Sequence, residues 1–156
     1  MDKKIWHYHF DVSKISIVDD GFGISEISFK NTKCFYDCIE EETPLILETS
    51  KQLREYFCGK RKSFDIPLST KGTPFQTKVW NALKLIPYGK TQTYKEIATI
   101  INSPKACRAV GMANNKNPIS IIIPCHRVVG SNNSLVGYAS GIHIKKYLLE
   151  LEKRNI

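Results

Sequence analysis

The chain has 156 residues, 42% of them hydrophobic and 24% charged, so it can bury one or two cores and its composition excludes an intrinsically disordered protein. The formal net charge is +8, but residues 1–70 carry 10 Lys or Arg against 12 Asp or Glu, whereas residues 71–156 carry 13 against 3. The charge of +10 in the C-terminal half favours a polyanionic partner, and nucleic acid is the commonest intracellular candidate. A basic surface that only aids solubility is the alternative.

The chain starts with "MDKKIWHYHF", which lacks the apolar stretch of a secretory signal, and no window reaches the roughly 18 apolar residues of a membrane span. We therefore expect a cytoplasmic protein without a membrane partner. The five cysteines are an odd number, which favours free thiols over a disulfide scaffold. Cys34 and Cys38 could supply half of a metal site with His7 or His9, but a convincing second pair of ligands is missing, so we expect no metal.

The N-terminal half reads as a small α/β unit. In "KISIVDDGFGISEISF", two β-rich runs flank Asp-Asp-Gly at residues 19–21, which predicts a hairpin. Apolar residues between Leu45 and Cys58 lie near helical spacing and predict a helix, with Thr49 or Ser50 as a candidate N-cap and Gly59 as its stop. The segment "SFDIPLSTKGTPF" is rich in turn-forming residues and coincides with the change in charge, so we place a domain boundary near residue 70, between domains 1–70 and 71–156.

Three helices are predicted at the start of the second domain. The first begins at residues 73–74, buries Trp80 on its apolar face and ends at Pro87, and the second follows in "TQTYKEIATIIN". The third lies in "SPKACRAVGMANNKNP", with Ser103 as N-cap and Pro104 at its first position. The tight connection between the second and third helices is typical of a helix-turn-helix motif.

The third helix has the composition of a DNA-facing helix. Lys105, Arg108 and Lys116 are basic, and small residues such as Ala106 would let a duplex backbone approach closely. Many basic helix pairs bind nothing, so this pattern alone leaves DNA binding and no binding about equally open.

Cys125 and His126 stand side by side after the apolar run "IIIP", which is expected to be a buried strand. A thiol is a useful nucleophile when ionised, a nearby imidazole can take its proton, and a carboxylate can fix the imidazole tautomer. The C-terminal half offers Glu96, Glu150 and Glu152, and Glu152 lies closest to the apolar face of the helix predicted in "HIKKYLLELEK". A buried core cysteine is the alternative.

The string "NPISIIIPCHRVVGSNNSLVGYASG" resembles the active-site segment of the O6-alkylguanine-DNA alkyltransferases, also called methylated-DNA–protein-cysteine methyltransferases. The Pro-Cys-His-Arg-Val core, the Asn-Pro pair at 117–118 and the Gly-Tyr pair at 137–138 carry the resemblance, which extends over residues 73–153. It implies an α/β N-terminal domain, with a small antiparallel sheet and a helix in a ribonuclease-H-like arrangement. It also implies a mostly α, winged helix-turn-helix C-terminal domain.

The resemblance assigns the chemistry to four residues. Cys125 would accept the alkyl group and keep it as a thioether, so each molecule would act once as a methyltransferase. His126 would deprotonate Cys125 through a water, Glu152 would orient His126, and Asn117 would tie the cysteine turn to the helix-turn-helix. Arg127 is expected to form a structural ion pair, with a contact to DNA as the alternative.

The resemblance also assigns residues to the DNA interface. Arg108 would enter the base stack and fill the space of the flipped nucleotide, a step that is needed because the O6 carbon lies within the duplex. Tyr94 would crowd the adjacent phosphate and hydrogen-bond the flipped guanine. Lys105 and Ala106, at the start of the third helix, would lie against the DNA.

The base pocket would be lined by Tyr94, Val128, Tyr138 and Ala139. Some members of the family have a serine whose hydroxyl faces the O6 atom where this chain has Ala139, and a frequent glycine is replaced by Ser140. We therefore expect an altered substrate range and an active protein.

The sequence thus predicts DNA repair by direct alkyl transfer from O6-alkylguanine, and from O4-alkylthymine, in double-stranded DNA. The protein would act as a monomer without a cofactor. A module that binds alkylated bases and recruits other factors, and a cysteine hydrolase with a Cys-His-Glu triad, are the alternatives.

Overall fold

The computed structural model describes residues 2–29 and 37–156, which form two compact units. The first unit comprises the chain up to Lys71 together with Pro118–Ser120, and the second comprises Gly72–Asn117 and Ile121–Ile156. Within the described residues, no helix has the length and apolar character needed to cross a membrane.

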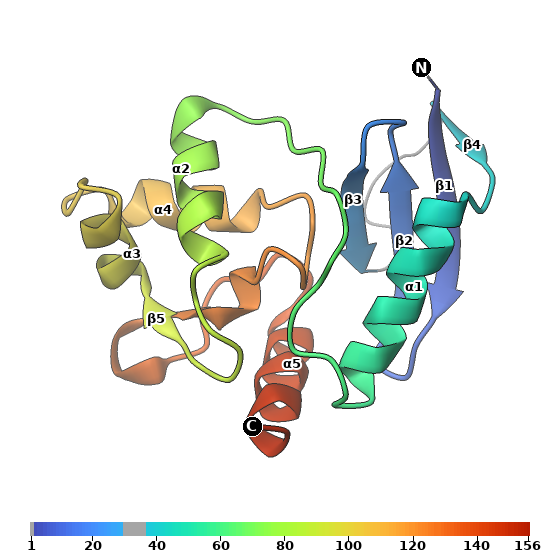
Figure 1. Cartoon of the computed structure of the whole chain (residues 1–156). Helices are drawn as coiled ribbons and strands as arrows, with labels where there is room; N and C mark the ends of the chain where they lie inside the picture. The colour runs from blue at the N-terminus through green and yellow to red at the C-terminus, as the bar shows by residue number, and fades with distance from the viewer. Residues whose placement is uncertain (1, 30–36) are drawn as a thin grey trace. The chain divides into compact units, whose positions relative to one another are not determined.

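A four-stranded sheet and one helix build the first unit (Figure 1). The strands are β1 (Lys3–His9), β2 (Lys14–Asp19), β3 (Ile24–Phe29) and β4 (Cys38–Glu40), in the order β3-β2-β1-β4. The hairpin of β2 and β3 is confirmed, and its turn is held by the carboxylate of Asp20, which accepts hydrogen bonds from the backbone of Phe22 and Gly23. The sheet departs from the expected antiparallel pattern at one edge, where β4 pairs with β1 in parallel.

The helix α1 (Pro44–Phe57) packs against β2 and begins earlier than the sequence predicts. The N-cap is Thr43, whose hydroxyl accepts a hydrogen bond from the backbone of Ile46, and Pro44 occupies the first helical position. The predicted caps Thr49 and Ser50 are wrong. Both lie buried inside the helix and donate to carbonyl groups one turn before them, so the helix interior satisfies their hydroxyls.

Helices dominate the second unit. They are α2 (Pro74–Leu83), α3 (Tyr94–Ile100), α4 (Cys107–Asn115) and α5 (Ile142–Arg154), joined by the short parallel strands β5 (Gln92–Thr93) and β6 (Val128–Val129) and the 3-10 turns η1 (Cys125–Arg127) and η2 (Ser131–Asn133). Trp80 of α2 is buried as expected, and its indole N–H donates to the carbonyl of Ala113, which fastens α2 to α4.

The third predicted helix starts later than expected, at Cys107. Ser103 is not its cap, because Ser103 and Pro104 belong to a separate turn that is closed by a hydrogen bond from Ala106 N to the Ser103 carbonyl. Asn102 has a positive φ of 61°, which reverses the chain between α3 and α4. As a result, residues 105–106 lie at the entrance of α4 rather than on it.

The apolar run before Cys125 is not a strand. Residues 118–120 pair with β3 in the first unit, through hydrogen bonds from Ile27 N to the Pro118 carbonyl and from Ser120 N to the Ile27 carbonyl. The backbone then turns at Ile121, whose φ of 73° is unusual for a β-branched residue. A strand cannot continue through this conformation, so buried residues 121 and 123 lie in a turn that leads to the cysteine.

Candidate active site

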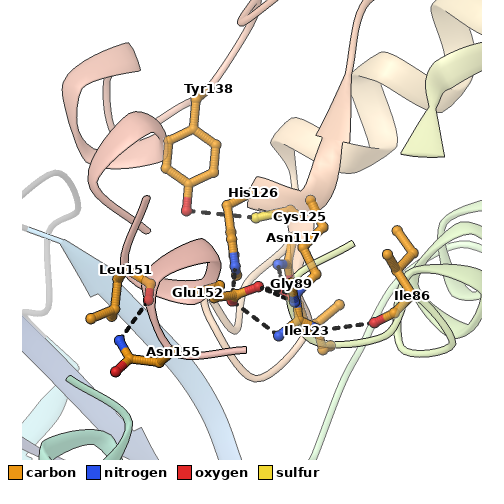
Figure 2. A network of polar contacts seen from close by, with 11 residues as sticks. Ile86, Gly89, Asn117, Ile123, Cys125, His126, Tyr138, Leu151, Glu152 and Asn155 are labelled. Atoms are coloured by element: carbon orange, nitrogen blue, oxygen red, sulfur yellow. Dashed lines mark hydrogen bonds and ion pairs between the residues drawn. The ribbon is translucent and has the colours of Figure 1, made fainter. Parts of the chain in front are cut away.

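Cys125 is the first residue of η1 and is 5% exposed. Its backbone N–H donates to the carbonyl of Ile123 at 2.8 Å, and the side-chain amide of Asn117 donates to the same carbonyl at 2.7 Å (Figure 2). Asn117 follows the end of α4, so its amide fixes the cysteine turn relative to the helix pair within the second unit. The role that the resemblance implies for Asn117 stays a prediction, and this hydrogen bond is compatible with it.

His126 and Glu152 are buried together beneath the cysteine turn (Figure 2). The imidazole Nε2 lies 2.6 Å from Glu152 Oε2, which places the proton of a neutral imidazole on Nε2. The other nitrogen, Nδ1, is then an acceptor, and it is buried with no hydrogen-bond partner among the described residues. The arrangement presents a proton acceptor on the residue next to the thiol.

Arg127 holds the other side of the Glu152 carboxylate. Its guanidinium donates from Nε to Oε1 at 2.9 Å and from Nη2 to Oε2 at 3.0 Å, while Nη1 donates to the carbonyl of Ile86 at 2.7 Å. The backbone N–H of Gly89 adds a fourth hydrogen bond to Glu152 at 3.1 Å. Arg127 therefore forms the expected ion pair, in bidentate geometry that fixes the carboxylate.

The electrostatics of the site favour neutral Cys125 and His126 beside a charged carboxylate. Burial raises the pKa of the Cys125 thiol, and hydrogen bonds from Asn117 and Tyr138 reduce this effect. Burial lowers the pKa of His126, and the charges of Arg127 and Lys145 lower it further, so this pKa lies below its ordinary value although Glu152 raises it. Burial would raise the pKa of Glu152, but the hydrogen bonds and charges of His126 and Arg127 outweigh it and hold that pKa well below its usual range.

Two tyrosines approach the thiol from other elements. The Tyr138 hydroxyl lies 3.9 Å from Cys125 Sγ, and Figure 2 shows its ring pointing toward the sulfur. Tyr94, the first residue of α3, donates from its hydroxyl to the carbonyl of Val136 at 3.1 Å. Burial raises the pKa of Tyr94, and negative charge on Cys125 would raise it further. The Tyr94 hydroxyl thus remains a protonated donor at neutral pH.

Both parts of the chain match the sequence patterns of a known protein family. The pattern of the family described as "6-O-methylguanine DNA methyltransferase, DNA binding domain" matches residues 74–154, and that of its "ribonuclease-like domain" matches residues 6–70. The chain belongs to the 6-O-methylguanine DNA methyltransferase family. The resemblance seen in the sequence is therefore confirmed.

Relatives in this family match most of the chain. A methylated-DNA–protein-cysteine methyltransferase of Methanosarcina acetivorans is 51% identical over 144 residues, covering 90% of this chain and 92% of the relative. The constitutive enzyme of Bacillus subtilis is 55% identical over 114 residues, covering 72% and 69%.

Solved structures confirm the fold class of a ribonuclease-like α/β domain followed by a helical DNA-binding domain. The structure of Mycobacterium tuberculosis OGT in complex with DNA has a TM-score of 0.90, 38% identity, and coverage of 99% of this chain and 94% of that one. An O6-methylguanine DNA methyltransferase of Methanococcus jannaschii has a TM-score of 0.72, 29% identity, and coverage of 97% and 95%.

The predicted DNA-facing residues of this family member lie on α4 and in the turn before it. Arg108 is exposed on the first turn of α4, Lys105 is exposed in the turn before it, and Ala106 is half-buried as the α4 N-cap. Lys116 is exposed at the α4 C-cap. The structure therefore leaves the basic groups of α4 open to a partner.

The predicted pocket residues Val128 and Ala139 lie in different surroundings. Val128 is fully buried in β6, opposite Gln92 of β5, so its side chain belongs to the packed interior near η1. Ala139 lies in the loop between Gly137 and α5, next to Tyr138. Their roles as pocket walls stay predictions.

Sequence reasoning missed two buried polar residues at the site. Asn114 of α4 donates from its side-chain amide to the Cys125 carbonyl at 3.4 Å. Lys145 of α5 is 0% exposed. The spacing in the sequence could have indicated that Lys145 is buried. Lys145, Leu148 and Glu152 follow one another at helical intervals, and all three lie on the buried face of α5.

The candidate metal pair cannot be assembled from the structure. Cys34 lies outside the described residues, and Cys38 has a free thiol. Among residues 2–29 and 37–156, no group of three or more His, Cys, Asp or Glu side chains could hold a metal ion.

Proposed function

We propose that this protein repairs double-stranded DNA by moving the alkyl group of O6-alkylguanine, and of O4-alkylthymine, to Cys125 in a single turnover. The observation that carries the proposal is the buried Cys125-His126-Glu152 arrangement in a chain of this family, with His126 Nδ1 as an unoccupied acceptor. In this proposal the protein acts as a cytoplasmic monomer without a cofactor, because the reaction moves only an alkyl group and a proton.

The chemistry is a displacement at carbon. His126 takes the proton of the Cys125 thiol at Nδ1, through one water, while Glu152 keeps the proton of Nε2 in place. The thiolate attacks the alkyl carbon, so a carbon–sulfur bond forms and the carbon–oxygen bond breaks. The electron pair of the broken bond stays with the guanine, which takes up one proton and regains its normal form. The thioether is stable, so the protein is consumed.

The helix pair delivers the base to the thiol. Turning a nucleotide out of the duplex costs a few kcal/mol, and the exposed Arg108 on α4 offsets part of this cost by filling the gap in the stack. Tyr94 and Tyr138 then contact the flipped base, with Val128 and Ala139 completing the pocket. We assign DNA binding and alkyl acceptance to the domain of residues 71–156, and a supporting role to residues 1–70.

A label-transfer experiment tests the proposal. Duplex DNA that carries O6-[³H-methyl]guanine, mixed with freshly reduced protein in excess over the lesion, should pass one label per lesion to a peptide containing Cys125. With excess DNA, transfer should stop at one label per protein. The matched variant Cys125→Ser should bind the duplex and take up no label. Absence of transfer would overturn the proposal, and repeated turnover would favour a hydrolase.

Arg108→Ala tests the flipping role separately. We expect this variant to lose at least tenfold in transfer rate while its affinity for unmodified duplex falls much less, because one phosphate-facing charge contributes modestly to nonspecific binding. Lys116→Ala, which removes a charge at the other end of α4, is the control. Equal losses on plain and alkylated duplex in Arg108→Ala would contradict a role in flipping.

A further inference from the structure

The Lys145 side chain is buried without a carboxylate partner. It lies on α5 and is 0% exposed, and its Nζ donates to the carbonyl of Val136 at 3.1 Å. Among the described residues, no ion pair joins Lys145 to an acidic side chain. Burying an ammonium group without a counter-charge is costly, and a hydrogen bond to one carbonyl does not supply that counter-charge.

The surroundings of Lys145 point to the reacting cysteine. Its Nζ lies 5.9 Å from the ring centre of Tyr94 and 5.9 Å from that of Tyr138, within the range of cation–π attraction. The Tyr138 hydroxyl in turn lies 3.9 Å from Cys125 Sγ. The Lys145 ammonium and the Tyr94 hydroxyl also donate to the same carbonyl, that of Val136. Lys145 therefore contacts both tyrosine rings and also the backbone of the loop that carries Tyr138.

The titratable groups that face this ammonium are Cys125, His126, Tyr94 and Tyr138. Arg127 and Glu152, the remaining charged residues of the site, neutralise each other as an ion pair. Burial lowers the pKa of Lys145, and a thiolate at Cys125 would raise it. The Lys145 charge in turn lowers the pKa of Cys125 and that of His126. One cation therefore favours both the thiolate and the neutral, proton-accepting imidazole.

We propose that Lys145 is a positioning residue for the reaction, whose ammonium supplies the counter-charge for the Cys125 thiolate and holds Tyr94 and Tyr138 against it. This inference rests on the proposed function and extends it to a residue outside the Cys-His-Glu set. During the displacement, negative charge moves from sulfur toward the guanine oxygen as the carbon–sulfur bond forms and the carbon–oxygen bond breaks. Lys145 stays protonated throughout and balances that charge.

Alkylation by iodoacetamide tests the inference without DNA. The rate at Cys125 would be followed against pH by mass spectrometry of the Cys125 peptide, in the unchanged protein and in Lys145→Gln, Lys145→Arg and Lys146→Gln. The apparent pKa of Cys125 should rise in Lys145→Gln enough to slow alkylation about tenfold at neutral pH. Lys145→Arg should recover part of the loss, and Lys146→Gln, which alters an exposed neighbour, should match the unchanged protein. An unshifted profile in Lys145→Gln would overturn the inference.

A second measurement needs no variant at Lys145. In protein with ¹³C-labelled lysine, the Cε resonance of Lys145 would be titrated before and after Cys125 is carbamidomethylated by iodoacetamide. Blocking the sulfur removes the thiolate, so the pKa of Lys145 should fall. An identical pKa in the free and blocked proteins would show that the two groups do not interact.

The outcomes separate this inference from the proposed function. One outcome is that the unchanged protein transfers label from methylated DNA while Lys145→Gln shows the same pH profile of Cys125 alkylation as the unchanged protein. In that case only the role of Lys145 fails. If the unchanged protein transfers no label, the proposed function fails, whatever the thiol titration shows.

Discussion

Glu152 accepts four hydrogen bonds within the second unit, from His126, from two nitrogens of Arg127 and from the backbone of Gly89. Glu152→Gln should therefore destabilise the protein by about 3 kcal/mol at neutral pH, because the buried guanidinium loses its counter-charge. The depressed pKa of Glu152 means that its stabilisation is present above the ordinary Glu pKa of about 4.3 and is lost as the pH falls below it. Urea unfolding at pH 7 and pH 3.5 should show the difference between the two proteins shrinking at the lower pH.

The neighbouring acid offers a matched control. Glu150 is exposed on the same helix, so Glu150→Gln should change the free energy of unfolding by less than about 0.5 kcal/mol. Glu152→Gln should also raise the apparent pKa of Cys125, since a poorly held imidazole accepts the thiol proton less well. An alkylation pH profile identical to that of the unchanged protein would show that Glu152 is structural and takes no part in the proton relay.

The sequence predicted the pairing of His126 with Glu152 because the basic half contains only three acids and one of them borders an apolar helix face. It could not predict the state of Lys145. A lysine at the edge of an apolar face ordinarily extends its charged end into water, and the pattern is the same when the ammonium stays inside. The tyrosines that surround this ammonium come from separate segments, α3 and the loop before α5, which only the fold brings together.

Among the helices, α3 depends most on its cap, because it has only seven residues. The Thr93 hydroxyl accepts a hydrogen bond from Glu96 N, and the Glu96 carboxylate accepts one from Thr93 N, which forms a capping box. Thr93→Ala should lower the free energy of unfolding by about 1 kcal/mol in urea titrations. Thr99→Ala, on the exposed end of the same helix, should change it by less than about 0.5 kcal/mol. Equal effects of the two variants would show that the cap does not stabilise the domain.

The cap candidates in the sequence located some helix starts and missed others. Thr73 was identified correctly, and Gln76 completes its capping box. At α1, three hydroxyl residues lay within reach, and the burial of Thr49 and Ser50 in the folded protein left Thr43 as the cap. At α4, the Ser-Pro pair at 103–104 has the pattern of a helix start but forms the turn that reverses the chain after α3. Local propensity cannot distinguish these cases, because tertiary packing decides them.

Across the whole molecule, basic charge is concentrated in residues 71–156, which hold 13 of the 23 Lys and Arg but only 3 of the 15 Asp and Glu. If the exposed groups Lys105, Arg108 and Lys116 contact phosphates, binding to unmodified duplex should release about three counterions. The logarithm of the association constant should then fall with the logarithm of the salt concentration with a slope of about −3. Fluorescence anisotropy with a labelled duplex between 50 and 300 mM KCl, roughly the range in which such slopes are linear, measures it.

Two variants that each remove one charge test whether this salt dependence comes from the helix pair or from the net charge of the protein. Lys116→Gln should reduce the steepness of the slope by about one, because one phosphate contact is lost. Lys60→Gln removes an exposed charge from the acidic first unit and should leave the slope unchanged, although it lowers the net charge of the protein by the same amount. Equal changes in the two variants would mean that DNA affinity depends on the net charge of the protein. That result would contradict a DNA-binding role for the helix pair.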